Sequence, residues 1–194
     1  MRLRAFRMIL ALAAVIGAQF PSATAAFVSA EGWEALRQPG AVAIMRHALA
    51  PGTGDPADFR VDDCASQRNL DERGRAQARA IGEAFRANGI AVDRVLSSQW
   101  CRCLDTAELL GLGAVEELPP LNSFFGGHGS REPQTERTRA FLDALPEGER
   151  AVLVTHQVNI TALTGGYPSS GEVFVLNVRD GGEVEITGRI MISP

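Results

Sequence analysis

Lysine is absent from this sequence of 194 residues, and all 19 of its basic side chains are arginine. Without a lysine ammonium group, the chain cannot form a lysine Schiff base or the type of phosphate loop that depends on lysine. An excess of positive charge is also missing, because 23 acidic side chains give a formal net charge of −4. This balance disfavours non-specific nucleic-acid binding, and we expect no nucleic-acid partner.

Cysteine is scarce, with three residues at Cys64, Cys101 and Cys103. In an oxidising compartment two of them can pair and leave one over. Cys101 and Cys103 are only two positions apart, which is a poor spacing for a mutual disulfide, so we predict that Cys64 pairs with one of them. A zinc site is the rival interpretation, but no pair shows zinc-finger spacing. We therefore predict no metal and no cofactor.

Hydrophobic runs of membrane-spanning length are also missing. The run from Met8 to Ala18 has eleven residues, too few to cross a bilayer comfortably. Three arginines precede it and the small residues Ala23-Thr24-Ala25 follow it, which is the layout of a secretory signal peptide. We predict that residues 1–25 are a signal peptide and 26–194 a single domain, periplasmic or secreted, with no membrane span. An uncleaved anchor or an ordinary N-terminal helix remains the alternative.

The remaining chain alternates between helical and strand patterns. Short apolar runs predict buried strands, apolar residues at helical spacing predict helices, and Gly, Pro and Asp clusters predict loops. The predicted strands are 41–45, 92–96, 115–118 and 151–155, with a terminal hairpin of 172–178 and 183–192. The predicted helices are 30–37, one capped by Asn69 in a capping box with Glu72, one starting just after Ser98, and 135–145. This alternation favours an α/β fold with a mostly parallel sheet and helices on both faces.

Chemically active side chains follow the predicted strands. Arg46 and His47 come directly after 41–45, His156 comes directly after 151–155, and Arg102 lies in the first turn of a helix after 92–96. In such sheets, sites form beyond the carboxyl ends of the strands. Guanidinium groups bind phosphoryl oxygens through forked hydrogen bonds, and a neutral imidazole can attack phosphorus. Each residue alone is more often structural, but together they indicate a phosphoryl-transfer site.

Four ordered segments resemble the histidine phosphatase superfamily, also called phosphoglycerate mutase-like. They are Ile44-Met45-Arg46-His47-Ala48, Asn69-Leu70-Asp71-Glu72-Arg73-Gly74-Arg75-Ala76-Gln77-Ala78, Ser97-Ser98-Gln99-Trp100-Cys101-Arg102-Cys103-Leu104-Asp105-Thr106-Ala107 and Val152-Leu153-Val154-Thr155-His156. The resemblance implies a three-layer α/β/α fold with a mostly parallel sheet. It also implies that His47 is the nucleophile that becomes phosphorylated, and that Arg46, Arg102 and His156 contact the phosphoryl oxygens.

The sequence departs from the family pattern around the leaving group. Asn122 stands where the family often has an acidic residue, and Gln157 rather than aspartate follows the second histidine. An alkoxide leaving group needs a proton. Asp55 is a candidate to supply it, with a plain turn residue as the alternative, or the substrate carries a good leaving group such as phosphohistidine or an anhydride. Gln67, Asn69 and Asn122 are candidates for substrate binding.

Three functions follow from these observations. The first is an exported phosphohydrolase that acts through a phosphohistidine on a small phosphorylated substrate, for which the family branch acting on phosphorylated envelope sugars is one analogy. The second is a binding protein for phosphate or phospho-sugars that has weak or no turnover, supported by Asn122 and Gln157. The third is a metal-binding or redox protein that uses the three cysteines and His128.

Overall fold

The computed structural model describes residues 23–193. Nearly all of the predicted signal peptide, residues 1–25, lies outside this range and stays a prediction. Within the described range, no helix is both long and apolar enough to cross a membrane.

A six-stranded sheet forms the middle layer of the fold, in the order β3-β2-β4-β1-β5-β6. The strands are β1 (Val42–Arg46), β2 (Arg94–Ser97), β3 (Val115–Glu117), β4 (Ala151–Thr155), β5 (Val173–Arg179) and β6 (Glu183–Ile190). The first four pair in parallel, whereas β5 is antiparallel to both β1 and β6. The predicted parallel sheet and terminal hairpin are therefore confirmed.

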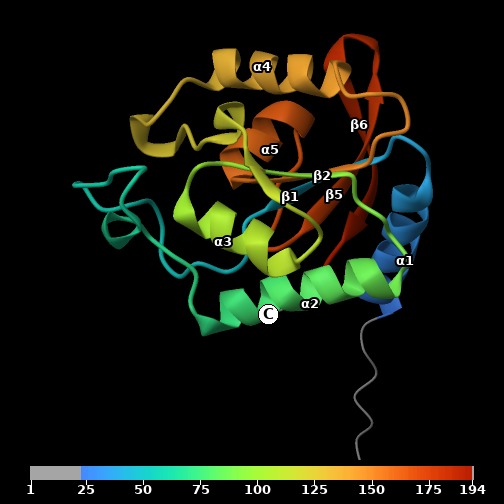
Figure 1. The fold of residues 1–194 in the computed structure, drawn as a ribbon, viewed down its shortest axis with the longest axis horizontal. Coiled ribbons are helices and arrows are strands. Elements are labelled where there is room, and N and C mark those ends of the chain that lie inside the picture. Colours follow the sequence, from blue (N-terminus) through green and yellow to red (C-terminus); the bar gives the residue numbers. More distant parts are fainter. Residues whose placement is uncertain (1–22, 194) are drawn as a thin grey trace, which may run out of the picture.

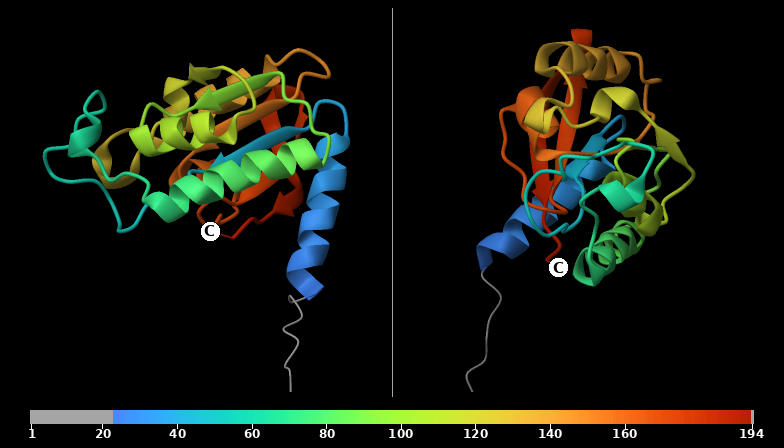
Figure 2. Two further views of the ribbon diagram at one scale, coloured as in Figure 1. Left: turned by 60° about the horizontal axis from the view of Figure 1, so that its bottom comes forward. Right: turned by 90° about the vertical axis from the view of Figure 1, so that its left-hand side faces the viewer.

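Helices cover both faces of this sheet. One face carries α1 (Ala23–Arg37), α2 (Glu72–Ala87) and α3 (Cys101–Leu110), and the other carries α4 (Arg131–Asp143) and α5 (Gln157–Thr164), as Figures 1 and 2 show. Alternate strand residues supply the two cores, because successive side chains in a strand point to opposite faces. In β1, for example, Met45 packs in the cluster with α1 to α3 and Ile44 packs in the cluster with Leu142 and Ile160. The predicted three-layer α/β/α fold is confirmed.

Two glycines in α2 let this helix approach its neighbours closely enough to fix the site. A Cβ atom on Gly74 would lie 1.9 Å from the carbonyl oxygen of Leu49, in the loop after β1. A Cβ atom on Gly82 would lie 1.9 Å from the carbonyl oxygen of Leu110, at the end of α3. Because only glycine avoids these clashes, α2 packs directly on the two segments that carry His47 and Arg102.

The predicted cap of α2 is wrong. The N-cap is Asp71, whose carboxylate accepts a hydrogen bond from the Gly74 N–H at 2.8 Å. Asn69 instead donates from its amide to the carbonyl groups of Cys64 and Gln67.

Other helix boundaries also differ from the prediction. α3 begins at Cys101 rather than just after Ser98, and α4 begins at Arg131 with Pro133 inside its first turn. Proline is tolerated there because the first N–H groups of a helix have no partner within it. The short helix α5 was not predicted.

Candidate active site

A cavity of about 150 Å³ lies beyond the carboxyl ends of the parallel strands. In Figures 1 and 2 the loop after β1 and the loop after β3 project at this same end of the molecule. The lining residues are Arg46, His47, Gly52, Thr53, Gly54, Arg68, Arg102, Ser123, Phe125, His156, Gln157 and Val158. The four residues predicted to form the phosphoryl site are therefore together. A larger cavity of about 670 Å³, lined by Gly40 and Arg179 among others at the opposite end of the sheet, contains none of them.

His47 is held as a neutral imidazole with one free nitrogen. Its ring Nδ1 lies 2.8 Å from the carbonyl oxygen of Ala48, which can only accept, so Nδ1 carries the proton. The lone pair is therefore on Nε2. Burial lowers the pKa of His47 well below its usual range, and the positive charge of Arg102 lowers it further. The side chain thus has the protonation state that a nucleophile needs.

His156 lies next to His47, with 5.6 Å between the ring centroids. Its Nδ1 accepts a hydrogen bond from Arg102 at 3.4 Å, so its proton is on Nε2, which donates to the Ser98 hydroxyl at 2.9 Å. The Ser98 hydroxyl in turn donates to the side-chain oxygen of Asn122 at 3.2 Å. Burial lowers the pKa of His156 well below its usual range, and His47 and Arg102 add to this effect.

The two buried histidines predict that stability depends on pH. Both are neutral in the folded chain, whereas each takes up a proton near pH ~6.5 in the unfolded chain. The unfolded state therefore binds more protons below this pH, and the free energy of unfolding falls by up to about 1.4 kcal/mol per pH unit for each histidine until the folded pKa is reached. Urea unfolding between pH 6.5 and 5, above most carboxyl titrations, measures this slope. His47→Gln should reduce it by about half, and an unchanged slope would contradict the neutral assignment.

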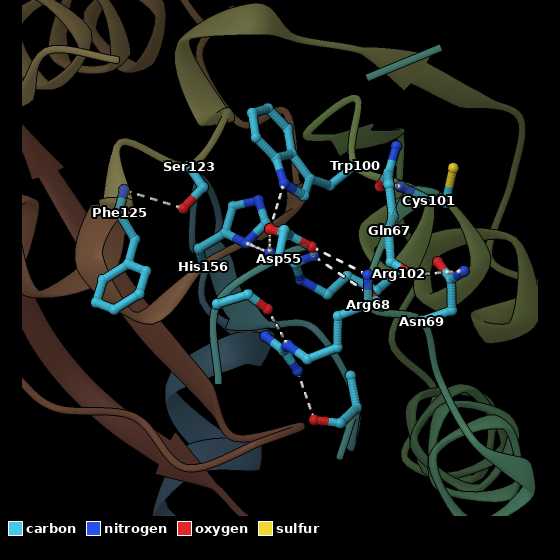
Figure 3. A network of polar contacts seen from close by, with 12 residues as sticks. Asp55, Gln67, Arg68, Asn69, Trp100, Cys101, Arg102, Ser123, Phe125 and His156 are labelled. Atoms are coloured by element: carbon cyan, nitrogen blue, oxygen red, sulfur yellow. Dashed lines mark hydrogen bonds and ion pairs between the residues drawn. The ribbon is translucent and has the colours of Figure 1, made fainter. Parts of the chain in front are cut away.

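Arg102 is fixed by a buried ion pair with Asp55. The two carboxylate oxygens of Asp55 lie 2.7 and 3.2 Å from the guanidinium nitrogens of Arg102, and Figure 3 shows these contacts. The side chains of Arg102 and Asp55 are only 3% and 4% exposed. The same carboxylate accepts from the Trp100 indole N–H and the Arg68 backbone N–H, each at 3.1 Å. Burial raises the pKa of Asp55, but the hydrogen bonds and charge of Arg102 outweigh it, so the pKa is lowered.

The proposed acid role of Asp55 is therefore corrected. The carboxylate is ionised, all its bonds are to donors, and it is not among the residues that line the cavity. Its position makes it the residue that orients Arg102.

Arg68 is a site residue that sequence reasoning missed. Its Nε donates to the carbonyl oxygen of Gly54 at 2.8 Å and its Nη1 donates to that of Ala50, so it holds the loop after β1 while lining the cavity. Arg68 directly precedes the segment that resembles the family, but it belongs to an irregular loop without periodicity. The signal that could have found it is the cluster of basic residues adjoining that segment.

The charges in the site match a phosphoryl dianion. Three guanidinium groups, of Arg46, Arg68 and Arg102, are opposed by the single carboxylate of Asp55, so two positive charges remain beside the neutral histidines. Within the described chain, the buried Nε atoms of Arg46 and Arg102 have no hydrogen-bond partner. Buried donors normally have partners, so these two atoms indicate an anion as the missing acceptor.

Gln67 does not reach the cavity, contrary to the prediction that it binds substrate. Its side-chain oxygen accepts from the Cys101 N–H at 3.0 Å, and its amide donates to the carbonyls of Arg60 and Val61. Gln67 therefore ties the loop to the start of α3.

Asn69 and Asn122 are likewise absent from the cavity lining. Asn69 bridges backbone carbonyls of its own loop. The side-chain oxygen of Asn122 accepts from Ser98 and from the Gln99 N–H, and its amide donates to the Gln99 side chain. Its neighbour Ser123, together with Phe125, lines the cavity instead.

A disulfide joins Cys64 to Cys101 across 5.7 Å between Cα atoms, so Cys64 pairs with one of the two candidates that the sequence left open. Cys103 is free and buried, and burial raises the pKa of its thiol to about 12. The disulfide removes two of the four ligands of the metal-site hypothesis. Within residues 23–193, no cluster of three or more His, Cys, Asp or Glu could hold a metal ion. The metal-site hypothesis therefore has no support in this part of the chain.

Comparisons with known proteins agree with this site. The family model of the histidine phosphatase superfamily (branch 1) matches residues 42–128. No curated protein sequence matches the chain. Among solved structures, the protein histidine phosphatase SixA complexed with tungstate is 18% identical with a TM-score of 0.55, covering 77% of this chain and 96% of that one.

Two further structures share the fold. A phosphohistidine phosphatase SixA, described as putative, from Agrobacterium tumefaciens is 20% identical with a TM-score of 0.56, covering 80% of this chain and 99% of that one. A mycobacterial glucosyl-3-phosphoglycerate phosphatase is 20% identical with a TM-score of 0.54, covering 74% and 94%. The family model therefore places the histidine phosphatase pattern on residues 42–128, and the solved structures show that this chain shares their fold.

Proposed function

We propose that this protein hydrolyses a small phosphorylated substrate through a phosphohistidine on His47. One observation carries the proposal: a buried, neutral imidazole keeps its Nε2 lone pair free inside a cavity with two uncompensated guanidinium charges. Such a site attracts a phosphoryl dianion and presents a nucleophile to it.

The reaction has two steps. In the first, Nε2 of His47 attacks phosphorus and the bond from phosphorus to the leaving group breaks. The proton stays on Nδ1 and is donated in a hydrogen bond to the Ala48 carbonyl oxygen, which stabilises the positive charge that the ring acquires. In the second, water attacks phosphorus, the P–N bond breaks, and neutral His47 and inorganic phosphate are released.

The arginines stabilise the charge that develops on the phosphoryl oxygens. Arg46 and Arg102 each have a buried Nε donor without a protein partner, and Asp55 keeps Arg102 in place. Fixed donors of this kind need no reorganisation during the reaction, which is why they favour the transition state.

The related structures support an anion in this cavity. The SixA structure was solved with tungstate, a tetrahedral oxyanion. That protein is named a protein histidine phosphatase and the Agrobacterium protein is named a phosphohistidine phosphatase, whereas the mycobacterial protein is named a glucosyl-3-phosphoglycerate phosphatase, so the names of proteins with this fold point to different leaving groups.

Export is a further part of the proposal: the protein works in the periplasm or outside the cell after loss of residues 1–25. The supporting observations are the charge and hydrophobicity pattern of that segment and the disulfide, which is typical of oxidising compartments. An N-terminus other than Ala26 in the exported protein would contradict the cleavage site.

The test compares the purified protein with His47→Ala on an activated aryl phosphate. We expect hydrolysis by the parent and a loss of about 10⁴-fold or more in the variant, which is the scale seen when a nucleophile is removed. An acid-labile phosphoryl group should be trapped on His47. His128→Ala is the matched control, because His128 is exposed and does not line the cavity.

Other outcomes would change the assignment. Equal activity in parent and His47→Ala would remove His47 from the mechanism. If neither protein turns over while inorganic phosphate raises the melting temperature of the parent, the protein is a phosphate-binding member of the fold.

A further inference from the structure

The mouth of the cavity is built from neutral side chains. The loops after β1 and β3 and the first turn of α5 form it, and the side chains that they place there are Thr53, Ser123, Phe125, Gln157 and Val158. They comprise two hydroxyls, one amide and two apolar groups. A leaving group that points out of the cavity therefore meets no carboxylic acid among these five side chains.

The nearby Asp55 carboxyl has no proton to give. Both of its oxygens accept hydrogen bonds from Arg102, one accepts from Trp100 and the other from the Arg68 backbone N–H. Protonating it would break a buried ion pair. The residue at the position of the family's acid, Asn122, carries an amide that is bonded to Ser98 and Gln99.

The remaining titratable groups of the cavity cannot act as the acid either. The proton of His156 is on Nε2 and is donated to Ser98, while its Nδ1 accepts from Arg102. The proton of His47 is on Nδ1 and is donated to the Ala48 carbonyl oxygen. The guanidinium groups stabilise an anion but do not transfer a proton, because arginine stays charged in proteins.

We infer that the leaving group departs without a proton from the protein, so the substrate is an activated phosphoryl compound whose leaving group is a weak base. This inference rests on the proposed function. When Nε2 of His47 bonds to phosphorus, the leaving group takes the electron pair of the broken bond and departs without receiving a proton. Carboxylates (pKa ~4) can do this readily. An N-phosphoryl imidazole can do so when its other ring nitrogen is already protonated in solution, because the leaving group is then neutral imidazole, whose conjugate acid has a pKa of ~6.5. A phenol (~10) leaves poorly and an aliphatic alcohol more poorly still. Acyl phosphates, phosphoanhydrides and N-phosphoryl imidazoles therefore fit the site, and alkyl or sugar-hydroxyl phosphates do not.

The test measures kcat/KM for a series of aryl phosphates of rising leaving-group pKa, from 4-nitrophenyl to phenyl phosphate, with acetyl phosphate and glycerol 2-phosphate at the two extremes. The ratio kcat/KM reports the phosphorylation step, since this is the step that releases the leaving group. A positioned general acid contributes about 10²–10⁴-fold, and its absence predicts a fall of at least about a hundredfold from 4-nitrophenyl to phenyl phosphate. His47→Ala measures the background for each substrate.

The outcomes separate this inference from the proposed function. A steep fall that persists in Asp55→Asn, at a lower overall rate, supports the inference. A flat series in the parent would overturn it, as would hydrolysis of glycerol 2-phosphate at the rate of acetyl phosphate. A flat series in the parent that becomes steep in Asp55→Asn would identify Asp55 as the acid. If no substrate phosphorylates His47, the proposed function fails and the inference fails with it.

Discussion

Replacing Asp55 with asparagine is expected to lower the free energy of unfolding by about 3–5 kcal/mol, the cost of removing one partner from a buried ion pair. The side chains of Asp55 and Arg102 are 4% and 3% exposed, so water cannot compensate for the lost charge. Arg68 also lines this cavity, and its positive charge would then repel Arg102. Urea unfolding of parent and variant measures the difference.

The matched control is Asp105→Asn. Asp105 pairs with Arg75 at 2.7 Å, but these side chains are 28% and 36% exposed, so the loss should be under about 1 kcal/mol. Equal losses in the free energy of unfolding of the two variants would contradict the larger stabilisation that we assign to the buried ion pair of Asp55.

A second measurement distinguishes positioning from general destabilisation. In Asp55→Asn, inorganic phosphate should raise the melting temperature more than in the parent, because the anion replaces the missing negative charge beside Arg102. The kcat of the variant on an activated aryl phosphate should still be low at saturating substrate, because Arg102 is no longer held in place. A variant that is merely less stable would keep its kcat at temperatures where it is folded.

The sequence predicts the centre of the site well because strand ends are encoded locally. The apolar run 151–155 is β4, and the run 41–45 differs from β1 by one residue at each end. Polar residues that directly follow such runs must lie at the same edge of a parallel sheet, which brings His47 and His156 together. Arg102 follows from the same logic, because it lies just inside the helix after β2.

The loop between β1 and α2 is where prediction from the sequence fails. Asp55, Gln67, Arg68 and Asn69 all lie in it, and their contacts are with each other's backbone or with α3. No periodicity specifies such contacts, because an irregular loop is shaped by distant partners rather than by its own spacing. The predictions that Gln67 and Asn69 bind substrate and that Asp55 transfers a proton therefore rested on residue type alone.

Helix α5 was missed for a related reason. It has eight residues, including the β-branched Val158, Ile160 and Thr161, which are weak helix formers. Its stability comes from packing Ile160 and Leu163 into the core with α4 and the sheet, which the local sequence does not reveal.

Reduction of the disulfide is expected to lower the free energy of unfolding by about 4 kcal/mol, because Cys64 and Cys101 close a loop with a sequence separation of 37. The melting temperature should fall by roughly 8–16 °C. Cys64→Ser should show the lowered stability without reductant. Cys103→Ala is the control and should respond to a dithiol as the parent does, because Cys103 is not in the disulfide.

Activity should respond less than stability to the loss of this bond. The loop before α2 is also tied to α3 by Gln67, which accepts from the Cys101 N–H, and by the Asp55 ion pair with Arg102. These contacts persist in a folded chain without the disulfide, so kcat/KM at 25 °C should stay within a few-fold of the parent. A reduced protein that is folded by circular dichroism but has lost its activity would show instead that the disulfide itself positions Arg102. The site would then depend on an oxidising environment for catalysis as well as for stability.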